Sequence, residues 1–458
     1  MTVQTLSIGQ FVGLATMRNR VILLTLLLCC VSVTLARKGF GPGEQEWDHV
    51  EVRPKAYLFW WLYFTTANVS SFYDKPLLIY LQGGPGASST SFGLFEEFGP
   101  LDTNLKPRNY TWVKDYNVLF IDSPVGTGFS YVDDKSALVT TNAQIAADLV
   151  TCIKEFYKKL PKFANVSTYI VTESYGGKMG AEFALVWYKE QKAGTIKSNL
   201  KGITLSDPWL SPIDTVLTWA PYLLATGIID SAGTKEIDKY AQMTLEAVNK
   251  KQWANATDLM ITTTIIVLNE TSNVDFFNIL TKVPYNSGAD NSSVKNVEAS
   301  TAYDDKQDIL KETDTCKKLG VGAIMDGQVR PALGLRAVHC AQNTEVHKTL
   351  MPEIMKPAVH IVEELLNETN LKVVVANGQL DLIVDTPGTL IWVEKLKWSG
   401  LAAWLESKRR PVVANGIVEG FVKSYGALSM YWVNRAGHLV PKDNPAAIAK
   451  LLEDLTAE

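Results

Sequence analysis

The sequence predicts an α/β fold, in which helices cover both faces of a mostly parallel β-sheet. Four short apolar runs indicate buried strands, at residues 76–81, 117–122, 168–172 and 202–207. A nearly continuous apolar strand is what a sheet covered on both faces requires. Helical patterns lie between these runs, notably at 142–160 and 177–192, and alternating strands and helices favour parallel pairing. Such a sheet binds its ligands at the carboxyl ends of its strands.

The N-terminal segment, residues 1–36, is predicted to be a signal peptide. Residues 21–36 form an apolar run, with Arg18 and Arg20 before it and Arg37 and Lys38 after it. A membrane span needs about 20 apolar residues, whereas a charged start, a shorter apolar stretch and small residues before the cleavage point are typical of a secretory signal. We therefore expect the secretory pathway and no stable membrane anchor after cleavage. The alternative is an N-terminal anchor that stays in place.

The rest of the chain divides into a core in two parts and an insertion between them. The first part of the core covers residues 37–207 and the second covers 365–458. Residues 208–364 change character: helix-periodic stretches such as 237–253 and a Ser/Asn/Gly/Asp-rich stretch near 286–293 replace the strand pattern, which predicts a helical cap. The strand-then-turn pattern returns at 371–378 and 429–437.

The run at 168–172 ends in the motif Thr-Glu-Ser-Tyr-Gly, with Ser174 at its centre. A Ser on a sharp turn between a strand and a helix is a nucleophile elbow, in which the bend exposes the hydroxyl and small neighbours relieve the crowding. Thr172 stands where this motif usually has its first Gly. The strand, turn and helix around Ser174 nevertheless predict the nucleophile of a hydrolase.

Two partners for Ser174 follow later strands in the order that this chemistry uses. Asp381 lies in the turn after 371–378, and His438 lies in the turn that closes the pattern at 429–437. The order Ser, Asp, His is that of the α/β-hydrolase fold. His takes the proton of Ser, and the carboxylate holds the imidazole in the required tautomer. For the carboxylate, Asp385 and, less plausibly, Asp207 compete with Asp381.

A Gly-rich loop at 82–88 follows the apolar run at 76–81 directly. Successive glycines let backbone N–H groups approach a ligand, and a loop after an early strand supplies one oxyanion donor in this fold. We therefore predict that the backbone N–H groups of Gly84 and Tyr175 form the oxyanion hole. No metal or cofactor is expected.

These motifs together resemble the serine carboxypeptidase family. The similarity is carried by YLQGGPGASS at 80–89, FEEFGP at 95–100, VLFIDSPVGTGFSYV at 118–132, TESYGG at 172–177, NGQLDLIVDT at 377–386 and NRAGHLVPKDNP at 434–445. The resemblance implies an α/β-hydrolase fold with a helical cap, a secreted or lysosomal setting, and removal of C-terminal residues from peptides at acidic pH. The implied partner is thus a peptide or protein C-terminus.

The resemblance also assigns four residues to the terminal carboxylate of the substrate: Gln82, Gly83, Glu97 and Glu173. Carboxyl groups that must accept another carboxylate cannot all be ionised, because like charges raise one another's pKa. One proton shared among Glu97, Glu173 and the substrate would tie binding to low pH. Gln82, Tyr80 and Ala87 depart from the Asn, Trp and Cys of the family. The first two changes touch the carboxylate site, and the third removes a disulfide.

Cysteines and sequons fit a secreted chain. Of the five cysteines, two lie in the predicted signal, and we expect Cys316 to pair with Cys340 while Cys152, in a helical pattern, stays a buried thiol. Seven N-x-S/T sequons are candidate glycosylation sites: Asn68, Asn109, Asn165, Asn255, Asn269, Asn291 and Asn367.

Composition narrows the function classes further. Of the 458 residues 47% are hydrophobic and 20% charged, with a net charge of -4, which excludes a disordered chain and gives no basic footprint for nucleic acid. The oligomeric state stays open. Two alternatives to a peptidase remain: an acyltransferase or esterase with the same triad, and a glycoprotein scaffold with negligible activity.

Overall fold

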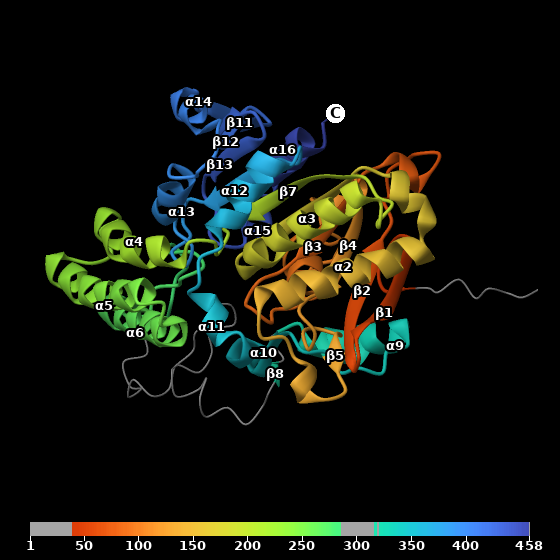
Figure 1. Ribbon diagram of the computed structural model, residues 1–458, viewed down its shortest axis with the longest axis horizontal. Coiled ribbons are helices and arrows are strands. Elements are labelled where there is room, and N and C mark those ends of the chain that lie inside the picture. Colours follow the sequence, from red (N-terminus) through yellow and green to blue (C-terminus); the bar gives the residue numbers. More distant parts are fainter. Residues whose placement is uncertain (1–38, 285–315, 318–319, 458) are drawn as a thin grey trace, which may run out of the picture. The chain divides into compact units, whose positions relative to one another are not determined.

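A single mixed β-sheet forms the centre of the computed structural model, which describes residues 39–284, 316–317 and 320–457 (Figure 1). The predicted signal peptide, the stretch near 286–293 and Asn291 fall outside these residues. The main sheet has the strand order β1-β2-β4-β3-β6-β7-β10-β13-β12-β11, with the short β5 paired to β2. A two-stranded sheet, β8 with β9, lies apart from it.

The strands have the following bounds: β1 Gln45–Arg53, β2 Ala56–Tyr63, β3 Leu77–Leu81, β4 Asn117–Asp122, β5 Tyr131–Val132, β6 Thr168–Glu173, β7 Leu200–Ser206, β8 Cys316–Lys317, β9 Gln342–Asn343, β10 Lys372–Gly378, β11 Arg410–Ala414, β12 Ile417–Tyr425 and β13 Leu428–Val433. The six central strands, from β4 to β13 in the sheet order, pair in parallel. All the apolar runs predicted as buried strands lie in this parallel centre. Every residue of β3, β4 and β6 is buried, as a doubly covered sheet requires.

The edges of the sheet are antiparallel, which the sequence analysis did not predict. Strands β1 and β2 form a hairpin on one side, and β13, β12 and β11 form a meander on the other. Short connections make antiparallel pairing possible there, whereas a parallel pair needs a long crossover. Residues of β1 alternate between buried and more exposed positions along much of the strand, as expected for a strand at the edge of the sheet.

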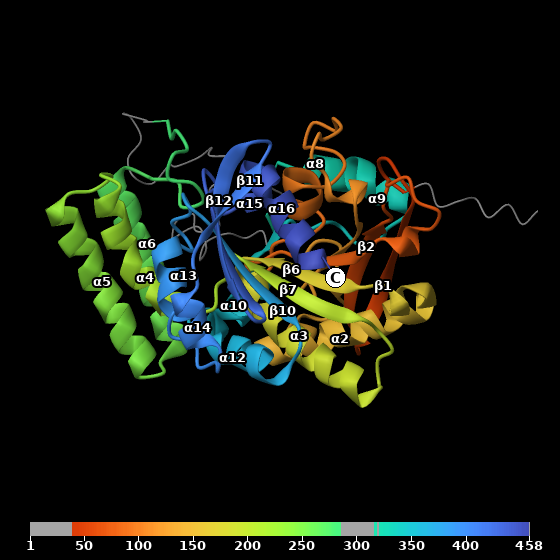
Figure 2. The same cartoon turned by 90° about the horizontal axis from the view of Figure 1, so that it is seen from above.

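Two helical layers enclose the sheet (Figure 2). Helices α2, α3 and α12 lie on one face, and α15 and α16 lie on the other, together with the short α8 and α9. The bounds are α2 Asn142–Lys159, α3 Tyr175–Ala193, α12 Val359–Glu368, α15 Val440–Asp443, α16 Pro445–Thr456, α8 Gly322–Ile324 and α9 Arg330–Leu333. Two separate hydrophobic cores fill the space between the sheet and these layers.

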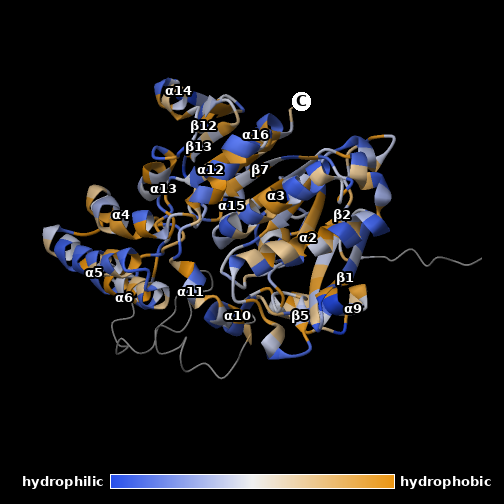
Figure 3. Cartoon of the chain, in the orientation of Figure 1, coloured by the Kyte–Doolittle hydropathy of each residue, from blue (hydrophilic) through white to orange (hydrophobic). Residues whose placement is uncertain are grey.

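The insertion joins β7 to β10 and begins with three packed helices. These are α4 Pro212–Ala225, α5 Ser231–Asn249 and α6 Trp253–Thr271. Helix α5 buries only one side, through Gly233, Ile237, Ala241, Thr244 and Ala247, and hydrophilic residues dominate its outer side (Figure 3). The helices α10 Thr344–Thr349 and α11 Met351–Ile354 complete the insertion, and α12 crosses the boundary predicted at residue 364.

The last part of the chain adds two helices after β10, α13 Thr386–Val393 and α14 Leu401–Glu406. Helix α13 packs against α4 of the insertion, so the insertion and the second part of the core share an apolar contact. No helix within the described ranges is both long and apolar enough to cross a membrane.

Candidate active site

The predicted nucleophile, Ser174, lies between β6 and α3 with φ 60° and ψ −128°. A positive φ is strained for a residue with a Cβ, and such strain collects at functional sites. The backbone holds Ser174 in place on both sides. Its N–H donates to Ser206 O at 3.0 Å, and its C=O accepts from Trp209 N at 3.0 Å. The end of β7 thus fixes the bend, and the Ser174 side chain stays partly exposed.

Glycines on α3 make room for this bend. A Cβ at Gly176 would lie 2.5 Å from Leu81 O, and a Cβ at Gly177 would lie 2.6 Å from Pro208 Cβ. Thr172, which stands where the motif usually has a Gly, packs against Gly180. A Cβ at Gly180 would lie 2.4 Å from Thr172 Cγ2. Thr172 Oγ1 donates to Thr204 O at 3.0 Å. Gly180, in the second turn of α3, therefore leaves the space that the Thr172 side chain fills.

The predicted partners Asp381 and His438 are in contact. His438 Nδ1 lies 2.7 Å from Asp381 Oδ2, and both side chains are buried. Asp381 Oδ1 accepts from Val384 N at 3.1 Å, which orients the carboxyl group. Burial lowers the pKa of His438, which favours the neutral imidazole that acts as a base, with Nδ1–H facing the carboxylate.

The two aspartates that competed with Asp381 have other positions. Asp385 caps α13: its Oδ1 accepts from Gly388 N at 3.2 Å and from Thr218 Oγ1 at 2.7 Å. Asp207 accepts from Gly378 N at 2.8 Å. One side-chain atom of each of Asp207, Asp381 and His438 lies within 4.8 Å of the others. Asp207 is therefore not the partner of His438 Nδ1, but it is a neighbour of the pair.

A segment of the insertion, after α6, holds the loops of Asp381 and His438 together. Phe276 O accepts from Leu382 N and Ile383 N, at 3.1 and 3.0 Å, and Phe277 O accepts from His438 N at 2.7 Å. A Cβ at Gly437 would lie 2.1 Å from Phe277 O, so only glycine permits this approach. No pattern in the sequence indicates this support, because it depends on contact between distant segments.

The predicted oxyanion loop lies directly against the elbow. A Cβ at Gly83 would lie 2.6 Å from Ser174 Cβ and 2.7 Å from Tyr175 N. Gly84 has φ +103°, a conformation that favours glycine. Tyr175 is the first residue of α3, and the first N–H groups of a helix have no intrahelical acceptor. The loop and the helix terminus can therefore offer N–H groups next to Ser174.

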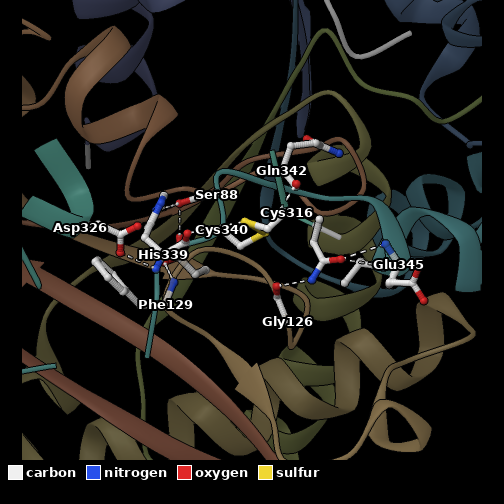
Figure 4. The surroundings of a disulfide bond; sticks show 12 residues. Ser88, Gly126, Phe129, Cys316, Asp326, His339, Cys340, Gln342 and Glu345 are labelled. Atoms are coloured by element: carbon white, nitrogen blue, oxygen red, sulfur yellow. Dashed lines mark hydrogen bonds between the residues drawn. A yellow bond between two sulfur atoms is a disulfide. The ribbon is translucent and has the colours of Figure 1, made fainter. Parts of the chain in front are cut away.

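Segment 339–343 supports this loop from outside (Figure 4). Gln342 Nε2 donates to Pro85 O at 3.1 Å, and Asn343 N donates to Gly86 O at 3.0 Å. A disulfide joins Cys316 to Cys340 next to these contacts. Figure 4 places His339 beside Ser88, whose Oγ lies 3.1 Å from His339 Nε2 and donates to Asp122 Oδ1 at 2.9 Å.

This second group of Ser, His and Asp differs from the predicted triad. Ser88, Asp122 and His339 are all buried, and the carboxylate contacts the serine rather than the histidine. Burial lowers the pKa of His339 to about 3, so the ring is neutral. The group is a hydrogen-bonded anchor of the Gly-rich loop.

The residues predicted to bind a terminal carboxylate form one buried cluster. Gln82 Nε2 donates to Glu173 Oε1 at 3.0 Å and to Glu97 Oε1 at 3.2 Å, and Gln82 Oε1 accepts from Gly83 N at 2.7 Å. Gln82 Nε2 thus holds the carboxyl groups of Glu97 and Glu173 close to each other, and the two groups titrate together. Burial raises the pKa of Glu97 to about 7, and burial with the adjacent charge of Glu97 raises the pKa of Glu173 well above its usual value. The pair therefore holds a proton in mildly acidic solution.

The sequence analysis placed the change at Tyr80 in the carboxylate site, and Tyr80 contacts this cluster. Its hydroxyl donates to Glu97 Oε1 at 3.0 Å and accepts from Gln82 Nε2 at 3.2 Å. Gly93 leaves space for the ring, since a Cβ there would lie 2.5 Å from Tyr80 Cε1. The replacement of Trp by Tyr thus puts a hydroxyl group beside Glu97.

The remaining predicted sites lie at the surface or in the core. Cys152 is a free, buried cysteine, and burial raises its thiol pKa. Six sequon asparagines are exposed: Asn68, Asn109, Asn165, Asn255, Asn269 and Asn367. Asn367 Nδ2 donates to Glu363 O and Lys397 O, at 2.8 and 2.9 Å.

Known proteins match nearly the whole chain. The family model described as serine carboxypeptidase matches residues 38–458. Retinoid-inducible serine carboxypeptidase of Homo sapiens is 40% identical, over 91% of this chain and 92% of that protein. Serine carboxypeptidase-like 51 of Arabidopsis thaliana is 33% identical, over 96% and 99%.

A solved structure extends this likeness to the fold. The prohormone-processing carboxypeptidase Kex1(delta)p of Saccharomyces cerevisiae superposes with a TM-score of 0.75, at 21% identity, over 90% of this chain and 91% of that chain. The predicted α/β-hydrolase fold, with its insertion between strands of the core, is thereby confirmed.

Proposed function

Because the chain belongs to the serine carboxypeptidase family, we propose that it removes C-terminal residues from peptides at acidic pH. The reaction runs through an acyl-enzyme at Ser174. His438 takes the hydroxyl proton as Ser174 attacks the last peptide carbonyl, and Asp381 stabilises the imidazolium that forms. His438 then gives this proton to the departing amine. Water, activated by His438 in turn, releases the shortened peptide and restores Ser174.

The oxyanion of each tetrahedral intermediate would be held by two backbone N–H groups, those of Gly84 and Tyr175. The contact between the Gly-rich loop and the elbow supports this assignment, because a Cβ at Gly83 would lie only 2.6 Å from Ser174 Cβ. Donors held rigidly where charge develops lower the barrier most effectively.

One observation carries the choice of an exopeptidase: the buried Glu97 and Glu173 pair directly beside the nucleophile. Glu173 is joined covalently to Ser174, and Gln82 links it to Glu97. A protonated carboxyl group donates a hydrogen bond to a peptide's terminal carboxylate, whereas two ionised groups would repel it. The pKa of Glu97, about 7, then sets the upper limit of the acidic range. Peptide C-termini are the proposed partners.

We further infer that the enzyme is secreted or lysosomal. Six exposed sequon asparagines and the disulfide between Cys316 and Cys340 support passage through an oxidising secretory compartment. A shift to lower mass after treatment with an endoglycosidase, in protein expressed by a secreting host, is the expected result. A chain without glycan in that host would contradict this setting.

The activity can be tested with the purified full chain at about pH 5. The substrates are an N-blocked dipeptide, its C-terminal amide and the corresponding ester. An exopeptidase releases the last residue of the free acid, cleaves the amide weakly, and loses both activities in Ser174→Ala. Ester turnover without peptide turnover would favour the esterase or acyltransferase alternative. If no substrate is turned over and a serine-directed probe does not bind, the scaffold alternative is favoured.

A further inference from the structure

Asp207 is a buried acid beside the predicted triad to which the proposed reaction assigns no task. It follows β7, which lies between β6, the strand of Ser174, and β10, the strand of Asp381. Asp207 N donates to Ala376 O at 2.8 Å, and Asp207 Oδ1 accepts from Gly378 N at 2.8 Å. Its φ of +41° is strained for a residue with a Cβ. The chain thus holds Asp207 firmly against the end of β10.

The carboxyl group of Asp207 faces that of Asp381, and both side chains are fully buried. One oxygen of each carboxyl group and one ring nitrogen of His438 lie within 4.8 Å of one another, so the two acids interact directly. Apart from that contact, Asp207 Oδ2 receives no hydrogen bond from any donor in the described part of the chain. Two carboxylates cannot both be ionised at this distance in a dry site, so one of them keeps a proton.

We propose that Asp207 is a positioning residue, whose protonated carboxyl group donates a hydrogen bond to Asp381 and so fixes that carboxylate against His438 Nδ1. The assignment of the proton to Asp207 follows from the other contacts of Asp381. Asp381 faces His438 Nδ1–H and accepts from Val384 N, so its negative charge is stabilised from two sides. Asp207 Oδ2 has no such donor. The inference rests on the triad of the proposed function.

The proposal makes the triad itself sensitive to pH. The titratable groups that face Asp207 are Asp381, His438 and, from the end of β6, Glu173. Asp275, Asp385 and Tyr222 face Asp381 from the insertion and from α13. Burial, with the charge of Asp381, raises the pKa of Asp207 well above its usual value. Loss of its proton at higher pH removes the hydrogen bond and places a second negative charge next to Asp381.

The test separates this effect from the Glu97 and Glu173 pair by avoiding substrates with a terminal carboxylate. The full chain reacts with an uncharged phosphonofluoridate probe between pH 4 and 8, and the rate of covalent labelling of Ser174 is measured. In Asp207→Asn, the amide donates to Asp381 at every pH, so labelling should persist about one pH unit further into the alkaline range than in the wild type. In Asp207→Ala, labelling should fall about tenfold at all pH values. Asp148→Asn, which alters a buried acid of α2 that pairs with Arg53, is the matched control and should keep the wild-type profile with this probe.

Two results would overturn the proposal: a wild-type profile in Asp207→Asn, or a loss in Asp207→Asn as large as that in Asp207→Ala. Thermal unfolding gives a readout that does not need turnover. The Tm of Asp207→Asn relative to the wild type should increase from pH 5 to pH 8, because only the wild type must ionise a buried acid. A difference in Tm that does not change with pH would also overturn it. Labelling with this pattern but without peptide turnover would contradict the proposed exopeptidase and leave the role of Asp207 intact.

Discussion

At the scale of single residues, burial of acids is the dominant feature of the site. Glu97, Glu173, Asp207 and Asp381 are all buried in or beside the predicted triad. They form two pairs of neighbouring carboxyl groups, and a proton shared between two buried carboxyl groups removes the repulsion that two charges would cause. Tyr80 adds a neutral donor to the first pair. The two pairs have different tasks in the proposed reaction: one receives the substrate, and the other orients the base.

Glu97→Gln tests the first pair. The amide can donate to a terminal carboxylate at any pH, whereas Glu97, with a pKa of about 7, loses its proton in neutral solution. The ratio of peptide to ester kcat/KM should fall about fivefold from pH 7 to pH 8 in the wild type and stay constant in the variant. Any effect of pH on the predicted triad changes the peptide and ester kcat/KM alike and so cancels in this ratio. A fall of equal size in both proteins would contradict the shared proton.

At the scale of elements, close approaches between loops and helices decide where the chemistry is placed. Helix α3 begins directly after Ser174, and its glycines lie against Leu81, Pro208 and Thr172. The loops of Asp381 and His438 are tied by hydrogen bonds to Phe276 and Phe277. The insertion therefore supports the loops that carry two residues of the predicted triad.

Gly180→Ala tests the packing of α3 behind the elbow. The new Cβ would lie 2.4 Å from Thr172 Cγ2, so we expect overpacking to cost about 1–3 kcal/mol and to lower peptide turnover by displacing Ser174. Thr172→Ser removes Cγ2 but keeps the hydroxyl that bonds to Thr204 O. Adding it to Gly180→Ala should restore both the Tm and the turnover. A double variant as unstable as Gly180→Ala would show that the clash is not the cause.

The disulfide between Cys316 and Cys340 is predicted to stabilise the oxyanion loop through segment 339–343. Closing a loop with a sequence separation of 24 contributes about 3 kcal/mol in the chain-entropy model. Replacing both cysteines by serine should lower the Tm by a few degrees and reduce ester and peptide turnover alike. Cys152→Ala is the control, which should lower the Tm but not the turnover per folded molecule.

Alkylation of the cysteines, with and without prior reduction, tests directly whether the disulfide between Cys316 and Cys340 forms. Two thiols of the mature chain should become reactive only after reduction and unfolding. Equal masses before and after reduction would show that the bond is absent.

At the scale of the whole molecule, the buried titratable groups predict a pH range of greatest stability. Carboxyl groups whose pKa values are raised in the folded state stabilise it at low pH, and this contribution is lost as the pH rises through the folded pKa. The lowered pKa values of His49, His339 and His438 act in the opposite direction below about pH 6.5. Burial lowers the pKa of Lys178 to about 7, which opposes the carboxyl groups only above that pH.

We therefore expect the Tm to be highest in mildly acidic solution and to fall from pH 6.5 to pH 8. Calorimetry of the full chain over this range measures it. The double variant Glu97→Gln with Glu173→Gln carries one acid pair fewer, so its Tm should fall less over the same interval. A wild-type Tm that rises from pH 6.5 to pH 8 would contradict this balance.

The parts of this structure that could be predicted from sequence are those that depend on local pattern. Strands β3, β4 and β6 are apolar along their whole length, so a parallel, doubly covered centre followed from composition alone. Ser174, Asp381 and His438 each follow a strand within a short motif. The positions of Asp207 and Phe277 could not be assigned in the same way, because they matter only where segments from distant parts of the chain meet. The antiparallel edges were also missed, although β1 carries an alternating pattern.

The position of the insertion has a consequence for how the chain reaches its native state. Gly202 of β7 pairs with Lys372 of β10, and the whole insertion lies between them in sequence. Strands β7 and β10 cannot pair until the ribosome has made both parts of the core. The centre of the sheet therefore depends on contacts of high sequence separation, which form slowly. Until then, the apolar edge of β7 is open to aggregation. In the proposed secretory setting, glycans and chaperones would act during this interval, before any peptide is bound.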